Sequence, residues 1–156
     1  MEKLEVLGAN KLRGSLKISG SKNASLPILV ATLLSEKPIS LKNVPKVKDI
    51  ETMLSLLCHL GSKIKKIKKK DLLEINNSKI CKILAPYNLV KTMRAGILVL
   101  GPLLSRFNKA TVSFPGGCLI GSRPIDIHLK ALSKLGVNYK FIKGYVHATA
   151  PNGLIG

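Results

Sequence analysis

A segment of this chain recurs at a constant spacing, and the recurrence constrains the fold more than any other feature of the sequence. Residues 50–61 and 125–136 share their apolar positions and a terminal glycine: Ile50-Glu51 aligns with Ile125-Asp126, Leu54 with Leu129, Leu57 with Leu132, and Leu60-Gly61 with Leu135-Gly136. This spacing is typical of an amphipathic helix that ends at glycine. Two unrelated amphipathic helices are the alternative. The strand pattern after each segment keeps the same register, which favours repeated units that stack their apolar faces.

Each half of the chain is expected to run helix, strand, helix, strand, strand. The first half predicts helices at 23–34 and 49–60 and strands at 39–41, 63–67 and 72–75. The second half predicts helices at 89–104 and 125–135 and strands at 110–113, 138–142 and 145–148. Short alternating segments at 4–7 and 15–19 predict two more strands before the first unit. The expected architecture is therefore an α/β domain of repeated units.

The strongly basic composition does not by itself indicate a nucleic-acid-binding protein. The 156 residues carry 26 Lys and Arg against 8 Asp and Glu, a formal net charge of +18. Proteins that read nucleic acids usually add arginine and stacking aromatic residues, but here aromatic residues are only 4% and tryptophan is absent. The lysine run at 63–70 begins with the alternation of a solvated edge strand. A basic binding module without catalysis remains as an alternative.

Length and cysteine usage indicate one ordinary domain in a reducing compartment. The chain is long enough to bury a core, and no apolar run reaches the length of a membrane span. The first residues lack the apolar core of a signal peptide, and three cysteines at irregular spacing do not suggest a disulfide framework. A cytoplasmic protein is expected. The three histidines (His59, His128 and His147) lack metal-ligand spacing, so no metal site is predicted.

One glycine-rich stretch, residues 114–126, concentrates reactive side chains. It places Cys118 between a pair of glycines and a third glycine, with Arg123 and Asp126 just beyond. A thiol in such a loop beside cations is a candidate for a low-pKa nucleophile or acid, and a tight packed turn is the equally open alternative. Arg123 is suited to bind a phosphate or carboxylate. Asp126 is expected to cap the following helix, as Asp49 would in the first unit.

Two other segments carry candidate anion-binding residues. Lys22 and Asn23 stand at a predicted helix start, where backbone donors and the helix dipole favour an anion, although a solvated lysine is the alternative. Arg94 lies within a predicted apolar helix, where its charge needs an ion-pair partner or a ligand. Cys58 and Cys81 have no glycine loop around them and are expected to behave as small apolar residues.

Taken together, the motifs resemble the enolpyruvyl transferase family. The matching segments occur in the same order and are Gly20-Ser21-Lys22-Asn23-Ala24, Asn43-Val44-Pro45, Ala85-Pro86-Tyr87, Lys91-Thr92-Met93-Arg94-Ala95 and Pro115-Gly116-Gly117-Cys118. They are similar to the N-terminal part of the UDP-N-acetylglucosamine 1-carboxyvinyltransferase branch, over essentially the whole chain. The shikimate-pathway branch lacks the cysteine loop and typically has Lys-Ser at positions 22 and 23.

The resemblance implies a fold of two inside-out α/β barrels, each made of three repeated helix-strand-helix-strand-strand units. Residues 21–156 would form about two units of one barrel, which is therefore incomplete, and residues 1–20 would form strands that pack with the second barrel. Substrates of the family bind between the barrels. The chain also stops at 151–156 without a capping pattern. A truncated form, inactive on its own, is expected, and a split enzyme whose second chain carries the missing barrel is the alternative.

The resemblance further implies transfer of the enolpyruvyl group of phosphoenolpyruvate to UDP-N-acetylglucosamine, with release of phosphate, in the first committed step of peptidoglycan synthesis. No metal or organic cofactor and no membrane partner are expected. Cys118 would be the general acid and the target of fosfomycin-type epoxides. The implied phosphoenolpyruvate contacts are Lys22, Asn23, Cys118 and Arg123. The implied UDP-N-acetylglucosamine contacts are Asn23, Arg94, Arg123, Pro124, Ile125, Asp126 and Ile127. Leu98 stands where the family usually has tryptophan, which leaves one sugar-nucleotide contact open.

Overall fold

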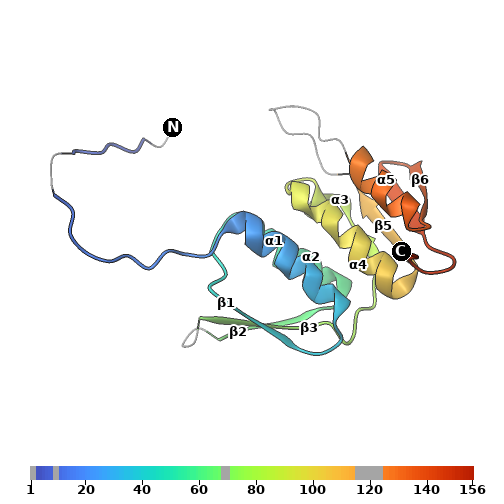
Figure 1. Cartoon of the computed structure of the whole chain (residues 1–156), viewed down its shortest axis with the longest axis horizontal. Coiled ribbons are helices and arrows are strands. Elements are labelled where there is room, and N and C mark those ends of the chain that lie inside the picture. The colour runs from blue at the N-terminus through green and yellow to red at the C-terminus, as the bar shows by residue number, and fades with distance from the viewer. Residues whose placement is uncertain (1–2, 9–10, 68–70, 115–124) are drawn as a thin grey trace.

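The computed structural model describes residues 3–8, 11–67, 71–114 and 125–156 (Figure 1). The first unit contains α1 (Lys22–Ala31), the 3-10 turn η1 (Thr32–Leu34), β1 (Ile39–Lys42), α2 (Lys48–Leu60), β2 (Lys63–Ile67) and β3 (Leu72–Asn76). A short strand, β4 (Leu84–Ala85), follows it. The second unit contains α3 (Tyr87–Val90), the 3-10 helix η3 (Arg94–Val99), α4 (Leu100–Phe107), β5 (Lys109–Ser113), α5 (Asp126–Lys134), β6 (Asn138–Ile142) and β7 (Tyr145–Thr149).

Strand pairing confirms the internal repeat. In the first unit β3 lies between β1 and β2, and in the second β7 lies between β5 and β6, with every one of these pairs antiparallel. β4 adds to the outside of β5 in parallel. The lysine-rich strand β2 is at an edge of its sheet, as its sequence predicted. Each unit thus folds its strands in the same order, which two unrelated helices would not require.

The repeated helices bury the same positions. In α2 the buried apolar residues include Ile50, Leu54 and Leu57, and in the second unit Ile125, Leu129 and Leu132 are buried at the matching positions. Gly61 ends α2 in the left-handed region with φ 116°, where a side chain would be strained. Figure 1 shows α1 and α2 on one side of the β1–β3 sheet, with α4 beside them. Their buried residues form one core across both units.

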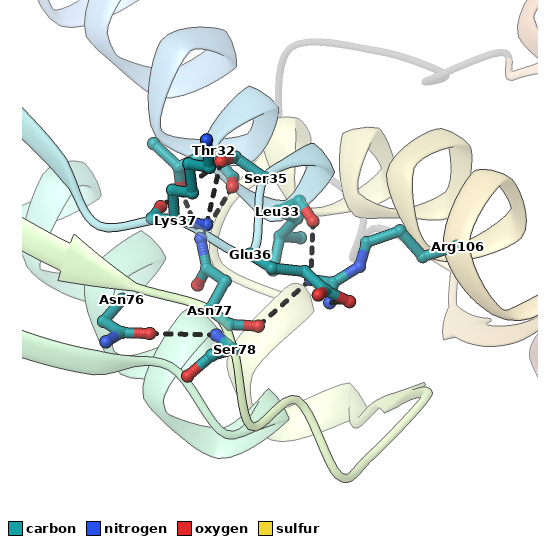
Figure 2. Close-up of polar contacts among 9 residues, drawn as sticks. All are labelled: Thr32, Leu33, Ser35, Glu36, Lys37, Asn76, Asn77, Ser78 and Arg106. Atoms are coloured by element: carbon teal, nitrogen blue, oxygen red, sulfur yellow. Dashed lines mark hydrogen bonds and ion pairs between the residues drawn. The ribbon is translucent and has the colours of Figure 1, made fainter.

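A buried polar network also joins the two units (Figure 2). Asn77, which follows β3 and is fully buried, donates from Nδ2 to the carbonyl oxygen of Thr32 at 2.7 Å and accepts at Oδ1 from the Ser62 hydroxyl at 2.6 Å. Arg106 of α4 donates from Nη1 to the carbonyl oxygens of Leu33 at 2.8 Å and of Asn77 at 3.1 Å. Its Nη2 contacts Glu36 at 3.1 Å. The second unit therefore holds the end of η1 and the exit of β3 together.

The two N-terminal strands predicted at 4–7 and 15–19 are not formed. Residues 3–8 and 11–20 have no regular structure and run away from the helices and sheets (Figure 1). Their apolar side chains are exposed; Leu4 and Leu12 are 93% and 94% accessible. A strand needs a neighbour for its backbone hydrogen bonds, and none of the described residues pairs with this segment. Its packing with a second barrel remains a prediction.

The prediction of a single helix at 89–104 was wrong, because the segment forms three shorter helices, α3, η3 and α4. The backbone leaves the helical region at Met93, with φ −137° and ψ 111°. Pro102 lies in the first turn of α4, where a missing N–H is tolerated, so it does not cause the break at Met93. The break matters for function because it puts Arg94 at the start of η3 rather than inside a long apolar helix.

Candidate functional site

Three segments far apart in sequence meet at a cavity of about 440 Å³, called here the α1–η3 pocket. It contains three of the predicted site residues, Lys22, Asn23 and Arg94. Its lining residues are Lys22, Asn23, Leu26, Pro27, Asp49, Met93, Arg94, Ala95, Ile97 and Leu98. Another cavity, of about 450 Å³ between α2 and the β2–β3 hairpin, contains none of the predicted site residues. The α1–η3 pocket is therefore the candidate site.

Lys22 and Asn23 are the first two residues of α1. The Ser21 hydroxyl caps the helix by accepting from the Ala24 N–H at 3.4 Å, and the Ser25 hydroxyl donates to the Ser21 carbonyl at 2.8 Å. First-turn N–H groups without intrahelical partners give this end of the helix a partial positive charge. Pro27, in the second turn, has no N–H to offer the Asn23 carbonyl. The start of α1 is thus suited to an anion.

The loop before α1 is held against the end of β1. The Gly20 N–H donates to Oδ1 of Asn43 at 3.1 Å. The backbones are so close that a Cβ on Gly20 would overlap the Asn43 carbonyl oxygen, so glycine is required there. Asn43 itself has φ 56°, which asparagine tolerates better than most residues.

Lys22 pairs with Asp49, the second residue of α2, at 2.9 Å between Nζ and Oδ2. About half of the Lys22 side chain is accessible, so the pair contributes little to stability. The expectation that Asp49 caps α2 was wrong, because the cap position is Val47, which makes no side-chain cap bond. Sequence reasoning missed the ion pair, because nothing local links two residues in different helices.

Arg94 begins η3 and is exposed, so the premise that its charge is buried in a helix was wrong. It makes no salt bridge with any residue that the structure describes. Leu98 is half-buried and lines the same pocket. With Lys22 and Arg94 positive and Asp49 negative, the pocket keeps an excess of positive charge.

Ile125, Asp126 and Ile127, the other predicted site residues that the structure describes, do not line this pocket. Cys118, Arg123 and Pro124 lie outside the described residues. At the start of α5, Ile125 is buried, whereas Asp126 and Ile127 are exposed. Asp126 is the first residue of α5 and not its cap, which is Ile125 and makes no side-chain bond, so that expectation was wrong too.

The connections from strand to helix differ between the two units. In the first unit β1 ends at Lys42 and α2 begins at Lys48, which leaves five residues between them. In the second unit β5 ends at Ser113 and α5 begins at Asp126, which leaves twelve. The cysteine-containing stretch therefore falls in the longer of the two equivalent connections.

Cys58 and Cys81 are both exposed, so the expectation that they pack as small apolar residues was wrong. Partial burial raises the pKa of the Cys58 thiol, and burial lowers the pKa of His128, whose Nε2 has no hydrogen-bond partner among the described residues. Within those residues no group of three or more His, Cys, Asp or Glu side chains could hold a metal ion. None of the helices described is long and apolar enough to cross a membrane.

Known proteins match nearly all of this chain. The family model for EPSP synthase (3-phosphoshikimate 1-carboxyvinyltransferase) matches residues 6–153. Over 156 residues the chain is 70% identical to UDP-N-acetylglucosamine 1-carboxyvinyltransferase of Pelagibacter ubique (strain HTCC1062) and 53% identical to that of Sulfurovum sp. (strain NBC37-1). Each match covers all of this chain but only 37% and 36% of the relative. The chain thus spans little more than a third of the length of these relatives.

Two solved structures share the fold. The enolpyruvyl transferase NikO from Streptomyces tendae has a TM-score of 0.77 at 20% identity, over 94% of this chain and 32% of that one. EPSP synthase from Acinetobacter baumannii has a TM-score of 0.64 at 17% identity, over 92% and 33%. These likenesses confirm the expected α/β enolpyruvyl transferase fold, of which this chain covers a part.

Proposed function

The chain belongs to the EPSP synthase (3-phosphoshikimate 1-carboxyvinyltransferase) family, and we propose that it supplies part of the site for enolpyruvyl transfer from phosphoenolpyruvate to UDP-N-acetylglucosamine. The choice of acceptor follows the relatives named for that sugar nucleotide, which match over the whole chain. The reaction would serve peptidoglycan synthesis in the cytoplasm. The observation that carries the proposal is the α1–η3 pocket, which gathers two cations and a helix start from separate parts of the chain.

The chemistry of the pocket suits a phosphorylated, carboxylated substrate. Phosphoenolpyruvate carries several negative charges at neutral pH, and Lys22 together with the first turn of α1 would bind its phosphate. Asp49 holds the Lys22 ammonium at the pocket by their 2.9 Å contact, so an arriving phosphate would replace or share that partner. The Asn23 amide offers donors and an acceptor to both substrates. Arg94 would bind the sugar nucleotide.

The proton-transfer role belongs to Cys118 in this proposal. Its thiol would donate a proton to the methylene carbon of phosphoenolpyruvate while the sugar 3-hydroxyl attacks the adjacent carbon. The hydroxyl proton would leave with the phosphate as hydrogen phosphate. The Cys118 thiolate would take a proton back from the new methyl group, which forms the enol ether product and restores the thiol. General-acid help of this kind contributes about 10²- to 10⁴-fold. Arg123 would bind the phosphate or carboxylate, and Pro124, Ile125, Asp126 and Ile127 would contact the nucleotide.

A chimaera tests the proposal at full length. This chain replaces the aligned 156 residues of the Pelagibacter ubique relative, and phosphate release is measured with phosphoenolpyruvate and either UDP-N-acetylglucosamine or shikimate 3-phosphate. Release is expected with the sugar nucleotide alone, and Cys118→Ala and Lys22→Ala are each expected to lower it at least tenfold. Lys37→Ala, an exposed lysine beyond the other end of α1, is the control. Transfer to shikimate 3-phosphate, or full activity without Cys118, would contradict the proposal.

A further inference from the structure

We propose that Asn43 is a positioning residue for the start of α1, where it fixes Lys22 and Asn23 in the α1–η3 pocket by holding Gly20. The inference deepens the proposed function and rests on it. Asn43 does not line the pocket, so it acts on the bound anion only through the backbone that it holds.

Asn43 connects the β1–β3 sheet to Gly20 in the loop before α1. It follows β1 directly, and Lys42, the last residue of β1, pairs with Leu72 of β3. Its Oδ1 accepts from the Gly20 N–H at 3.1 Å, two residues before α1 begins. The Asn43 carbonyl lies against Cα of Gly20, because a Cβ there would overlap it. Side chain and backbone of one residue therefore fix the same point of the loop.

No other hydrogen bond to a described residue holds the segment that precedes α1, residues 11–20. Residues 11–19 have no regular structure, and their side chains are exposed. Among the described residues, the bond from Gly20 to Asn43 is the single hydrogen bond that joins residues 11–20 to the rest of the chain. Without it, the first turn of α1 is free to fray at Ser21 and Lys22.

The same short connection makes a second contact with the start of α1. Residues 43–47 lead from Asn43 into α2, whose second residue, Asp49, pairs with Lys22. One five-residue connection thus holds the backbone at Gly20 and the ammonium at Lys22. Because two contacts act on neighbouring residues, loss of the Asn43 contact should loosen the pocket without unfolding the chain.

The test compares two asparagines that have the same backbone conformation. Asn43→Gly removes the acceptor but tolerates the left-handed φ of 56°, and Asn43→Asp keeps an oxygen acceptor. Asn108→Gly is the matched control, because Asn108 has φ 57° at the end of α4 and does not line the pocket. Amide hydrogen exchange at Gly20 and the dissociation constant for phosphoenolpyruvate, followed by amide chemical shifts, are measured on the whole chain.

Asn43→Gly is expected to speed exchange at Gly20 and to weaken phosphoenolpyruvate binding about fivefold, the usual effect of one hydrogen bond. Asn43→Asp should retain protection at Gly20, and Asn108→Gly should change neither quantity. Unchanged exchange and affinity in Asn43→Gly would overturn the inference, as would an equal effect of Asn108→Gly. If the full-length chimaera with the unmodified chain releases no phosphate, the proposed function fails, and exchange at Gly20 still decides whether Asn43 holds the loop.

Discussion

Replacement of Asn77 by alanine should destabilise the chain by about 3 kcal/mol. Asn77 is fully buried and makes two short hydrogen bonds, at 2.6 Å with the Ser62 hydroxyl and at 2.7 Å with the Thr32 carbonyl. Each bond contributes about 1 kcal/mol net, and a buried hydroxyl left without an acceptor costs about 1 kcal/mol more. The Thr32 carbonyl also accepts from the Ser35 N–H at 3.1 Å, so it keeps one partner in the variant. The hydroxyl of Ser62, a residue only 6% accessible, makes no second hydrogen bond to a described residue.

Urea unfolding followed by circular dichroism gives the free energy by linear extrapolation. Asn76→Ala is the matched control, because Asn76 is half-buried and its side chain accepts only one bond, from the Ser78 N–H at 2.9 Å (Figure 2). It should cost about 1 kcal/mol or less. Asn77→Asp should cost more than Asn77→Ala, because it buries a carboxylate oxygen against the Thr32 carbonyl oxygen with no donor between them. Equal midpoints for Asn77→Ala and Asn76→Ala would refute the view that the buried bonds of the Asn77 side chain stabilise the first unit.

Three further predictions concern stability. Arg106→Met should lower the free energy of unfolding in urea by about 2 kcal/mol, because it leaves the carbonyls of Leu33 and Asn77 with fewer donors. Glu36→Gln should lower it by less than about 0.5 kcal/mol, because the Glu36 side chain is 76% exposed, and equal losses would contradict this reasoning. Burial lowers the pKa of His128 from 6.5, so the unfolded chain binds the proton more readily, and the free energy of unfolding should fall as the pH drops below about 6.5. His128→Gln should make the free energy of unfolding less dependent on pH in this range, and an unchanged dependence would exclude His128 as its cause. Gly61→Ala should lower the free energy of unfolding by more than about 2 kcal/mol, because the added Cβ would lie 2.6 Å from the Lys79 carbonyl oxygen. Gly136→Ala is the control: Gly136 has φ 88°, its added Cβ would lie 3.8 Å from the nearest atom, and the change should cost about 1 kcal/mol. A larger loss in Gly136→Ala would count against the steric argument.

Patterns within one element were sufficient to predict most of the fold. The helix predicted at 49–60 (α2, Lys48–Leu60) and the strands at 63–67 and 138–142 were predicted correctly because apolar periodicity and a terminal glycine are local features. The N-terminal strands do not form in this chain because strand formation depends on a partner, which alternation alone does not supply. The prediction of one long helix at 89–104 was wrong because the backbone leaves the helical region at Met93, a break that the apolar content of the segment does not signal.

The candidate site was predictable in its residue types and not in its contacts. Helix-start chemistry pointed to Lys22 and Asn23, and both line the pocket with Arg94. The ion pair between Lys22 and Asp49 and the bond from Gly20 to Asn43 join segments whose separation in sequence carries no periodic signal. Such contacts follow from the way the first unit packs its two helices on one sheet, which only the folded chain reveals.

The connections from strand to helix, 43–47 in the first unit and 114–125 in the second, are under different length constraints. In the first copy the connection at 43–47 is under a length constraint, because an added residue would shift Asp49 relative to Lys22 and Asn43 relative to Gly20. In the second unit twelve residues separate β5 from α5. An insertion at 43–47 should therefore disturb the α1–η3 pocket, whereas a change of length between β5 and α5 would leave the contacts of Lys22 and Gly20 in place.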